Sequence, residues 1–248
     1  MTRASLEELV ESGMLSLDSL HPGGLETTRQ LAELCHIASG TRVLDVASGS
    51  GASACFLTQQ FGARVYGVDH SGEMVRRAQE CACAKELDVA FARADAVNLP
   101  FADAEFDVAI CECTLCFLDK TRVLSEMARV VRPGGYVGMH DLCWQPDAPA
   151  GLKRALAERE GERPETLEGW RQLFGKAGLI QLETVDISAV KSRWMGEMRR
   201  QLGAGGQLRL ALQIIRRWGL RGAWGVFRSE RLLSSDCLGY GLVVGRKR

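Results

Sequence analysis

The chain has 248 residues, of which 46% are hydrophobic, and its 31 Lys or Arg balance 31 Asp or Glu. This length suits one α/β domain with an elaboration, and a formal net charge of zero provides no overall field that favours nucleic acid. The first 20 residues lack the features of a signal peptide, and no apolar run approaches the roughly 20 residues of a membrane span. We therefore expect a cytoplasmic protein without a membrane span, whose nine cysteines are mostly thiols.

Residues 1–40 are predicted to form an N-terminal helical segment. Helical spacing of apolar residues covers 5–15 and 25–35, and the breaker His21-Pro22-Gly23-Gly24 separates the two helices.

The next stretch contains the most informative motif of the chain. An apolar strand over 42–46 leads into Ala47-Ser48-Gly49-Ser50-Gly51, and residues 52–61 are compatible with a helix. Glycines allow a sharp turn and a close approach of the backbone to a ligand, and the helix start offers free N–H donors. A second strand over 64–68 ends at Asp69, whose carboxylate can accept hydrogen bonds from a ribose diol. The motif predicts a nucleotide-cofactor site.

Read with its flanks, the motif resembles motif I of the class I S-adenosylmethionine-dependent methyltransferases, a strand ending in D-x-G-x-G-x-G. Ala47 stands at the first glycine of that form, and Gly49 and Gly51 at the other two. Three further blocks resemble the family in order and spacing: Asp95-Ala96 before Leu99-Pro100-Phe101, Glu105-Phe106-Asp107-Val108-Ala109-Ile110, and Arg129-Val130-Val131-Arg132-Pro133-Gly134-Gly135-Tyr136-Val137.

The resemblance implies a set of contacts to S-adenosyl-L-methionine. Asp69 would bind the ribose, Asp95 the adenine amino group, and the backbone N–H of Ala96 a ring nitrogen. His70-Ser71-Gly72-Glu73-Met74 resembles the family's turn into the next helix, with Ser71 as its N-cap. The full expected set is Asp45, Ala47, Ser48, Gly49, Gly51, Asp69, His70, Met74, Asp95, Ala96 and Cys111.

The implied fold is α/β, a Rossmann-like doubly wound sheet of seven strands with the last strand antiparallel. The methyltransferase core is expected over 41–188, with later strands at 89–92, 107–110, 136–140 and 181–187 and helices at 150–160 and 167–177. A helical cap insertion is expected over 189–236, before the final core strand in 237–248.

Cysteines gather where ligands of open α/β sheets bind, at the carboxyl ends of the strands. Cys111, Glu112, Cys113 and Cys116 follow one strand, and His140, Asp141 and Cys143 end another. In an extended chain Cys111 and Cys113 face one way and Glu112 the other, so a common role for them requires a turn. Cys113-x-x-Cys116 has no second ligand pair at zinc spacing, so no metal site is expected.

Two kinds of methyl acceptor stay open at this point. Cys113, Cys116 and Cys143 could hold a soft metalloid such as trivalent arsenic, since thiolates select soft ions. An organic metabolite, quinone-like or lipid-like, would instead accept the methyl group on O, N or C, with Glu112, His140 or Asp141 as the catalytic base.

The segment from Lys191 to Arg231 contains ten Lys or Arg against two Glu, interleaved with Leu, Ile and Trp. We expect a cap that covers a small-molecule pocket, and peripheral contact with an anionic membrane is an alternative use. Two other classes remain: a nicotinamide-dependent oxidoreductase, which leaves Asp45 and Asp95 without roles, and a non-catalytic cofactor-binding protein, for which Ala47 is the only hint. The sequence does not determine an oligomeric state.

Overall fold

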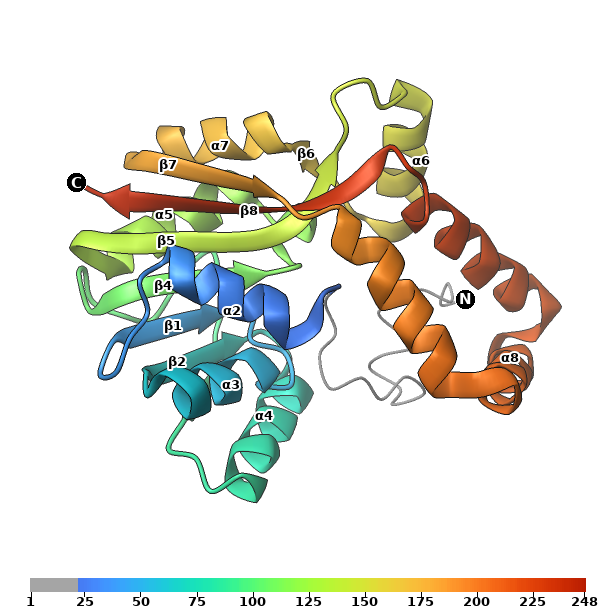
Figure 1. Ribbon diagram of the computed structural model, residues 1–248, viewed down its shortest axis with the longest axis horizontal. Helices are drawn as coiled ribbons and strands as arrows, with labels where there is room; N and C mark the ends of the chain where they lie inside the picture. Colours follow the sequence, from blue (N-terminus) through green and yellow to red (C-terminus); the bar gives the residue numbers. More distant parts are fainter. Residues whose placement is uncertain (1–21) are drawn as a thin grey trace.

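The computed structural model describes residues 22–248, without the side chains of 192–199, 201, 202, 204, 207 and 221. The helix predicted over 5–15 lies outside these residues. The described chain forms one sheet with helices on both faces and a long helical arm at one end (Figure 1).

The strands are β1 (Arg42–Val46), β2 (Arg64–Asp69), β3 (Ala90–Arg93), β4 (Phe106–Glu112), β5 (Val131–Trp144), β6 (Glu165–Thr166), β7 (Leu179–Asp186) and β8 (Leu238–Lys247). The helices are α2 (Gly24–Leu34), α3 (Ala52–Phe61), α4 (Gly72–Ala84), the 3-10 turn η1 (Leu115–Phe117), α5 (Lys120–Val130), α6 (Ala150–Glu160), α7 (Leu167–Lys176) and α8 (Ala189–Leu233).

The strands follow the order β3-β2-β1-β4-β5-β8-β7, with the two-residue β6 paired to β5. β3, β2, β1, β4 and β5 are parallel, whereas β8 runs antiparallel to both β5 and β7. The predicted Rossmann-like sheet with an antiparallel last strand is confirmed. In such a sheet the parallel strands end at one edge, here called the carboxyl edge, and ligands of open α/β sheets bind there.

Two hydrophobic cores cover the two faces of the sheet. One contains residues of α5 and α7, including the fully buried Met127, Trp170 and Phe174. The other contains residues of α2, α3 and α4, including Leu31 and Leu57. The central strand β1 contributes Leu44 to the first core and Val43 to the second, which is why its apolar run is continuous.

Strand β5 is longer than predicted. We expected it to end at His140, but it continues to Trp144, and residues 136–144 pair with β8 without interruption. The extension is also held from its other side, where the buried Trp170 indole nitrogen donates to the Leu142 carbonyl at 2.9 Å. His140 therefore lies inside the strand rather than at its end.

The insertion before the last strand is helical, and α8 contains two non-helical glycines, Gly203 and Gly219. These glycines break α8 into straight pieces, and the last two fold back on each other through Ile214, Trp218 and Val226. The pair of helices formed by residues 204–233 is here called the cap hairpin. Within residues 22–248 no helix is long and apolar enough to cross a membrane.

Candidate active site

The loop between β1 and α3 adopts left-handed backbone conformations at alternate residues. Ala47, Gly49 and Gly51 have φ values of +60°, +51° and +78°. An L side chain in this region costs about 1 to 2 kcal/mol, which explains the glycine in the family form at the position of Ala47. The loop nevertheless keeps its shape, so Ala47 provides no support for a protein that has lost its cofactor site.

Gly51 and Gly67 also make room for their neighbours. A Cβ on Gly51 would lie 2.8 Å from both the Ala78 Cβ and the Phe91 ring, and one on Gly67 would lie 2.9 Å from the Ser48 Oγ. By contrast, a Cβ on Gly49 would meet nothing within 4 Å. Gly49 thus faces open space above the loop, where a ligand can approach the backbone.

Asp69 fixes this loop from the end of β2. One carboxylate oxygen accepts from the Gly49 N–H at 2.9 Å and the other from the Ser71 N–H at 2.9 Å. Ser71 caps α4 as predicted, since its Oγ accepts from the Met74 N–H at 3.4 Å. The His70 ring is exposed beside Asp69, whereas Met74 is buried. Asp69 and His70 are therefore placed to reach a ligand on the loop, whereas Met74 is buried in the first turn of α4.

Asp45 is a buried carboxylate at the end of β1. Its Oδ2 has no hydrogen-bond partner within the described protein. Burial raises its pKa well above the usual range, and the nearby carboxylates Glu112 and Asp69 raise it further. A ligand that brings a positive charge or an N–H donor to this atom would satisfy it.

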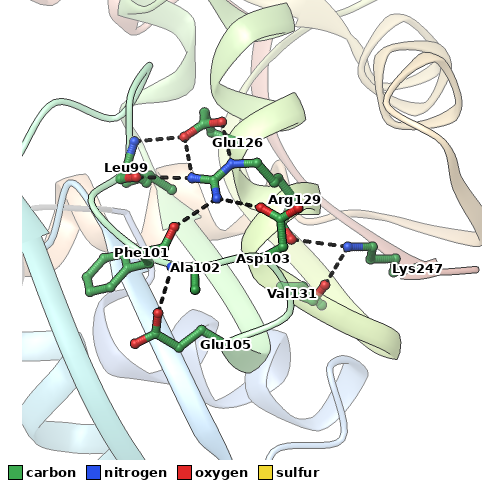
Figure 2. A network of polar contacts seen from close by, with 9 residues as sticks. All are labelled: Leu99, Phe101, Ala102, Asp103, Glu105, Glu126, Arg129, Val131 and Lys247. Atoms are coloured by element: carbon green, nitrogen blue, oxygen red, sulfur yellow. Dashed lines mark hydrogen bonds and ion pairs between the residues drawn. The ribbon is translucent and has the colours of Figure 1, made fainter.

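Asp95 lies in the loop that follows β3. Its side chain accepts from the Val97 N–H at 3.1 Å, and its carbonyl accepts from the Asn98 N–H, so Asp95 and Ala96 form a tight turn. Arg129 of α5 holds the next residues by donating to the carbonyls of Leu99 and Phe101 (Figure 2).

Glu112 ends β4 directly beside His140 of β5, with which it is in register. Its carboxylate accepts from Ser53 Oγ at 2.6 Å and from Thr28 Oγ1 at 3.2 Å, and it lies 3.8 Å from His140 Nδ1. Both side chains are buried. The arrangement places a carboxylate and an imidazole together at the carboxyl edge, under α2 and α3.

The chain turns immediately after Glu112. Cys113 has φ +52°, its N–H donates to the His140 carbonyl at 2.6 Å, and its Sγ lies 3.8 Å from His140 Nδ1. This is the turn that a common role for Glu112 and Cys113 requires. Cys111, one residue before Glu112, pairs with Val46 at the end of β1 and is fully buried in the core against which Ala47 also packs.

Asp141, which we predicted as an alternative base to His140, faces the opposite side of the sheet from His140, because β5 stays extended through both residues. Asp141 is fully buried and accepts from the backbone N–H groups of Leu142 at 2.7 Å and Cys116 at 3.1 Å. Its carboxylate fixes the η1 turn, and burial raises its pKa. It is a structural residue.

The other two cysteines that follow β4 or end β5, Cys116 and Cys143, are also buried. Cys116 and Cys143 pack in the same core as Cys111, and burial raises the pKa of the Cys116 thiol well above its usual value. Burial is also the main cause that raises the pKa of Cys113 and of Cys143. Among the side chains of the described residues, no group of three or more His, Cys, Asp or Glu is arranged to hold a metal ion.

Three residues near this site were not predicted from the sequence. The Thr28 and Ser53 hydroxyls donate hydrogen bonds to the Glu112 carboxylate, and the centroid of the Tyr240 ring lies 5.6 Å from that of the His140 ring. They come from α2, α3 and β8, which are distant in sequence, so no local pattern indicated them. The only available signal for Ser53 was its position in the first turn of the helix after the glycine loop.

A surface hollow of about 380 Å³ is lined by His36, Thr41, Asp107 and Arg132 among others. It lies at the amino ends of β1 and β4, opposite the glycine loop. Because ligands of open α/β sheets bind at the carboxyl edge, we do not assign the hollow to the reaction.

Comparison with known proteins identifies the class to which this fold and glycine loop belong. A family model described as a methyltransferase domain matches residues 44–139. The 27-O-demethylrifamycin SV methyltransferase of Amycolatopsis mediterranei (strain S699) is 32% identical over 230 residues, which cover 89% of this chain and 82% of that protein. The fold and site are thus those of a cofactor-dependent methyltransferase. The chain belongs to the class I S-adenosylmethionine-dependent methyltransferase family.

Other relatives are matched over a smaller share of their length. Methyltransferase GfsG of Streptomyces halstedii is 33% identical over 180 residues, 70% of this chain and 65% of that protein. Phosphoethanolamine N-methyltransferase 1 of Arabidopsis thaliana is 28% identical over 181 residues, 73% of this chain but 36% of that protein. The chain therefore aligns with just under two thirds of the length of GfsG and about a third of the length of the Arabidopsis enzyme.

Solved structures share the fold at lower identity. A phosphoethanolamine N-methyltransferase 2 of Haemonchus contortus in complex with S-adenosyl-L-methionine has a TM-score of 0.78 and 21% identity, over 96% of this chain and 56% of that one. The [4+2]-cyclase SpnF has a TM-score of 0.79 and 23% identity, over 98% and 92% of the two chains. The nicotinamide-dependent alternative receives no support from these matches.

The residues present fit S-adenosyl-L-methionine, the cofactor of this family. Gly49 leaves open space above the loop, Asp69 is fixed beside it, and the unpartnered Asp45 oxygen calls for a cationic or N–H donor group. The cofactor has such groups in its amino group and sulfonium.

Proposed function

We propose that this protein transfers a methyl group from S-adenosyl-L-methionine to a hydroxyl oxygen of a small organic metabolite. The observation that carries the proposal is the buried Glu112–His140 pair at the carboxyl edge, with His140 Nδ1 3.8 Å from the Glu112 carboxylate. The similarity to the 27-O-demethylrifamycin SV methyltransferase along most of both chains supports an oxygen acceptor.

The chemistry requires alignment and a place for one proton. The bound cofactor supplies a methyl carbon that is open to in-line displacement. The acceptor oxygen forms a bond to this carbon, the carbon–sulfur bond breaks, and its electron pair stays on sulfur. Holding the two reactants together supplies about 7 to 11 kcal/mol of barrier reduction. The His140 imidazole takes the hydroxyl proton, and Glu112 stabilises the resulting cation.

Thr28 and Ser53 position the Glu112 carboxylate for this role, because both hydroxyls lie within hydrogen-bond distance of its oxygens. Glu112 is thus anchored to α2 and α3 at once. The glycine loop and Asp69 bind the cofactor on the same edge, which places the donor next to the proposed base.

A soft-metalloid acceptor has less support. Cys111, Cys116 and Cys143 pack in the core, and burial keeps their thiols protonated at neutral pH. Only thiolates bind trivalent arsenic well. Cys113 alone is both near His140 and less buried.

The test measures S-adenosylhomocysteine release with 27-O-demethylrifamycin SV, with phosphoethanolamine, and with arsenite plus glutathione. We expect release with a hydroxyl-bearing acceptor, a loss of about 100-fold or more in His140→Asn, and a shifted pH profile in Glu112→Gln. Cys113→Ser and the exposed Cys83→Ser should both stay active. Release that depends on arsenite and disappears only in Cys113→Ser would contradict the proposal.

Cofactor binding is tested separately, by calorimetry with S-adenosylhomocysteine. Asp69→Asn should weaken binding by about 1.5 to 3 kcal/mol, because a charged acceptor beside the loop is lost. The exposed Asp147→Asn is the matched control and should bind normally. Unchanged affinity in Asp69→Asn would show that the cofactor site is elsewhere, whichever acceptor is used.

A further inference from the structure

The cap hairpin exposes two apolar stripes to solvent. Leu208, Leu212 and Ile215 follow one helix, and Leu220, Trp224 and Phe227 follow the other, both at the i, i+4, i+7 spacing of a single helix face. Leu220 is 76% exposed and Trp224 62% exposed. These six residues are here called the cap patch.

The cap patch is not needed to hold the hairpin together. The two helices pack through the buried Ile214 with Leu210, Trp218, Ala223 and Val226, none of which belongs to the patch. The hairpin is also attached to α6, where Arg159 donates to Ser229 Oγ at 2.9 Å. Exposed large apolar residues on a helix pair that is already packed mark an interaction surface.

The charge around the cap patch limits what can bind it. Residues 189–233 contain ten Lys or Arg against two Glu, so the other residues of the chain contain 21 basic against 29 acidic side chains. Arginines on the two helices are exposed beside the stripes: Arg209, Arg216, Arg217, Arg228 and Arg231. A symmetric dimer through this face would bring two strongly basic segments together, which disfavours a second copy.

The Trp224 and Phe227 rings stack at a centroid distance of 5.6 Å and an interplanar angle of 26°. Aromatic and aliphatic side chains beside arginines match the interface of a bilayer, where rings sit at headgroup level and cations meet lipid phosphates.

We propose that the cap hairpin binds the surface of an anionic phospholipid bilayer, with the cap patch entering the headgroup region. α8 begins where β7 ends, and β7 runs parallel to β5, so the hairpin extends from the carboxyl edge (Figure 1). Binding through the hairpin holds the acceptor side of the enzyme near the lipid. This inference does not depend on which acceptor is methylated.

The test is flotation of the purified full chain with vesicles of phosphatidylcholine alone or with 30% phosphatidylserine, at 0.1 M and 0.5 M NaCl. We expect binding to the anionic vesicles that falls in high salt, and little binding to neutral ones. The double variant Trp224→Ser/Phe227→Ser should bind at least about tenfold less, because the exposed rings no longer enter the interface. Since both side chains are largely exposed, the thermal unfolding temperature should not change.

A charge variant and its control complete the test. The triple variant Arg209→Gln/Arg216→Gln/Arg228→Gln should bind the anionic vesicles about 100-fold less tightly, because each lost arginine lowers the affinity about fivefold. Arg64→Gln/Lys85→Gln/Arg248→Gln removes the same charge from exposed sites on the core and should bind normally. No binding to anionic vesicles, equal loss in both triple variants, or a dimer in sedimentation that Trp224→Ser/Phe227→Ser dissociates would overturn the proposal.

Discussion

Gly51 and Gly49 share a left-handed backbone but differ in their surroundings. A Cβ on Gly51 would lie 2.8 Å from Ala78 Cβ and Phe91, whereas one on Gly49 meets nothing within 4 Å. Gly51→Ala should therefore lower the free energy of unfolding by about 2 to 4 kcal/mol, the sum of backbone strain and overpacking. Gly49→Ala should lower it by about 1 kcal/mol. Thermal unfolding measures both, with an expected drop of about 5 to 10 °C for Gly51→Ala. Equal drops would contradict the packing argument.

Asp45 makes the free protein sensitive to pH. The pKa of Asp45 is raised in the folded protein, whereas an unfolded aspartate ionises at about pH 4. Above that pH the unfolded chain therefore binds fewer protons than the folded protein. Stability of the wild type therefore falls as pH rises from there toward the raised pKa. Asp45→Asn removes this loss, and its unfolding temperature should exceed that of the wild type by an amount that grows from pH 4 to pH 8.

The same variant should bind S-adenosyl-L-methionine more weakly, because a neutral amide replaces the carboxyl group whose unpartnered Oδ2 is predicted to meet a cationic group of the cofactor. A calorimetric titration beside the unfolding measurement checks this opposite effect. A destabilised Asp45→Asn with no pH trend would show that the carboxylate is satisfied in the free protein.

At the scale of elements, α5 positions the loop that follows β3. The Arg129 guanidinium donates to the carbonyls of Leu99 and Phe101 and pairs with Glu126 at 2.8 Å, while Lys247 of β8 donates to the Arg129 carbonyl at 3.1 Å (Figure 2). One planar group thus ties the helix to the residues that directly follow the Asp95 turn.

Arg129→Lys should lower the free energy of unfolding by about 1 to 2 kcal/mol, because a lysine ammonium group cannot make all the hydrogen bonds of the planar guanidinium at once. Since the loop that contains the predicted cofactor ligand Asp95 loosens, the Michaelis constant for S-adenosyl-L-methionine should rise while kcat changes less. The control is Asp103→Asn, whose side chain is 78% exposed and pairs with the same guanidinium, with an expected cost below about 0.5 kcal/mol. A larger effect of Asp103→Asn than of Arg129→Lys would refute this role.

At the scale of the whole molecule, two glycines determine how the cap folds back. Gly203 has φ +57° and ψ 174°, and Gly219 has φ +68° and ψ −176°, a region that only glycine occupies readily. Gly203→Ala or Gly219→Ala should lower the free energy of unfolding by about 1 to 3 kcal/mol and straighten α8. Gly205→Ala, with open space around its Cβ, should be neutral or stabilising. Limited proteolysis and unfolding compare the three, and equal behaviour would contradict a fixed bend.

Elements whose signals are local could be predicted from the amino-acid sequence. The strand Arg42–Val46 and the helices Ala52–Phe61 and Ala150–Glu160 were predicted to the residue, because an apolar run, glycines or helical spacing marks each boundary. The glycine loop and the carboxylates Asp45 and Asp69 were found for the same reason, since they follow their strands directly.

The arrangement of side chains around Glu112 and His140 depends on tertiary contacts. β5 extends to Trp144 because β8, about a hundred residues later, pairs along it, and this places Asp141 and His140 on opposite faces. Glu112 meets His140 through strand register and meets Thr28 and Ser53 through helix packing. Such contacts depend on side chains brought together from distant segments, and the short-range spacing of residues carries no information about them.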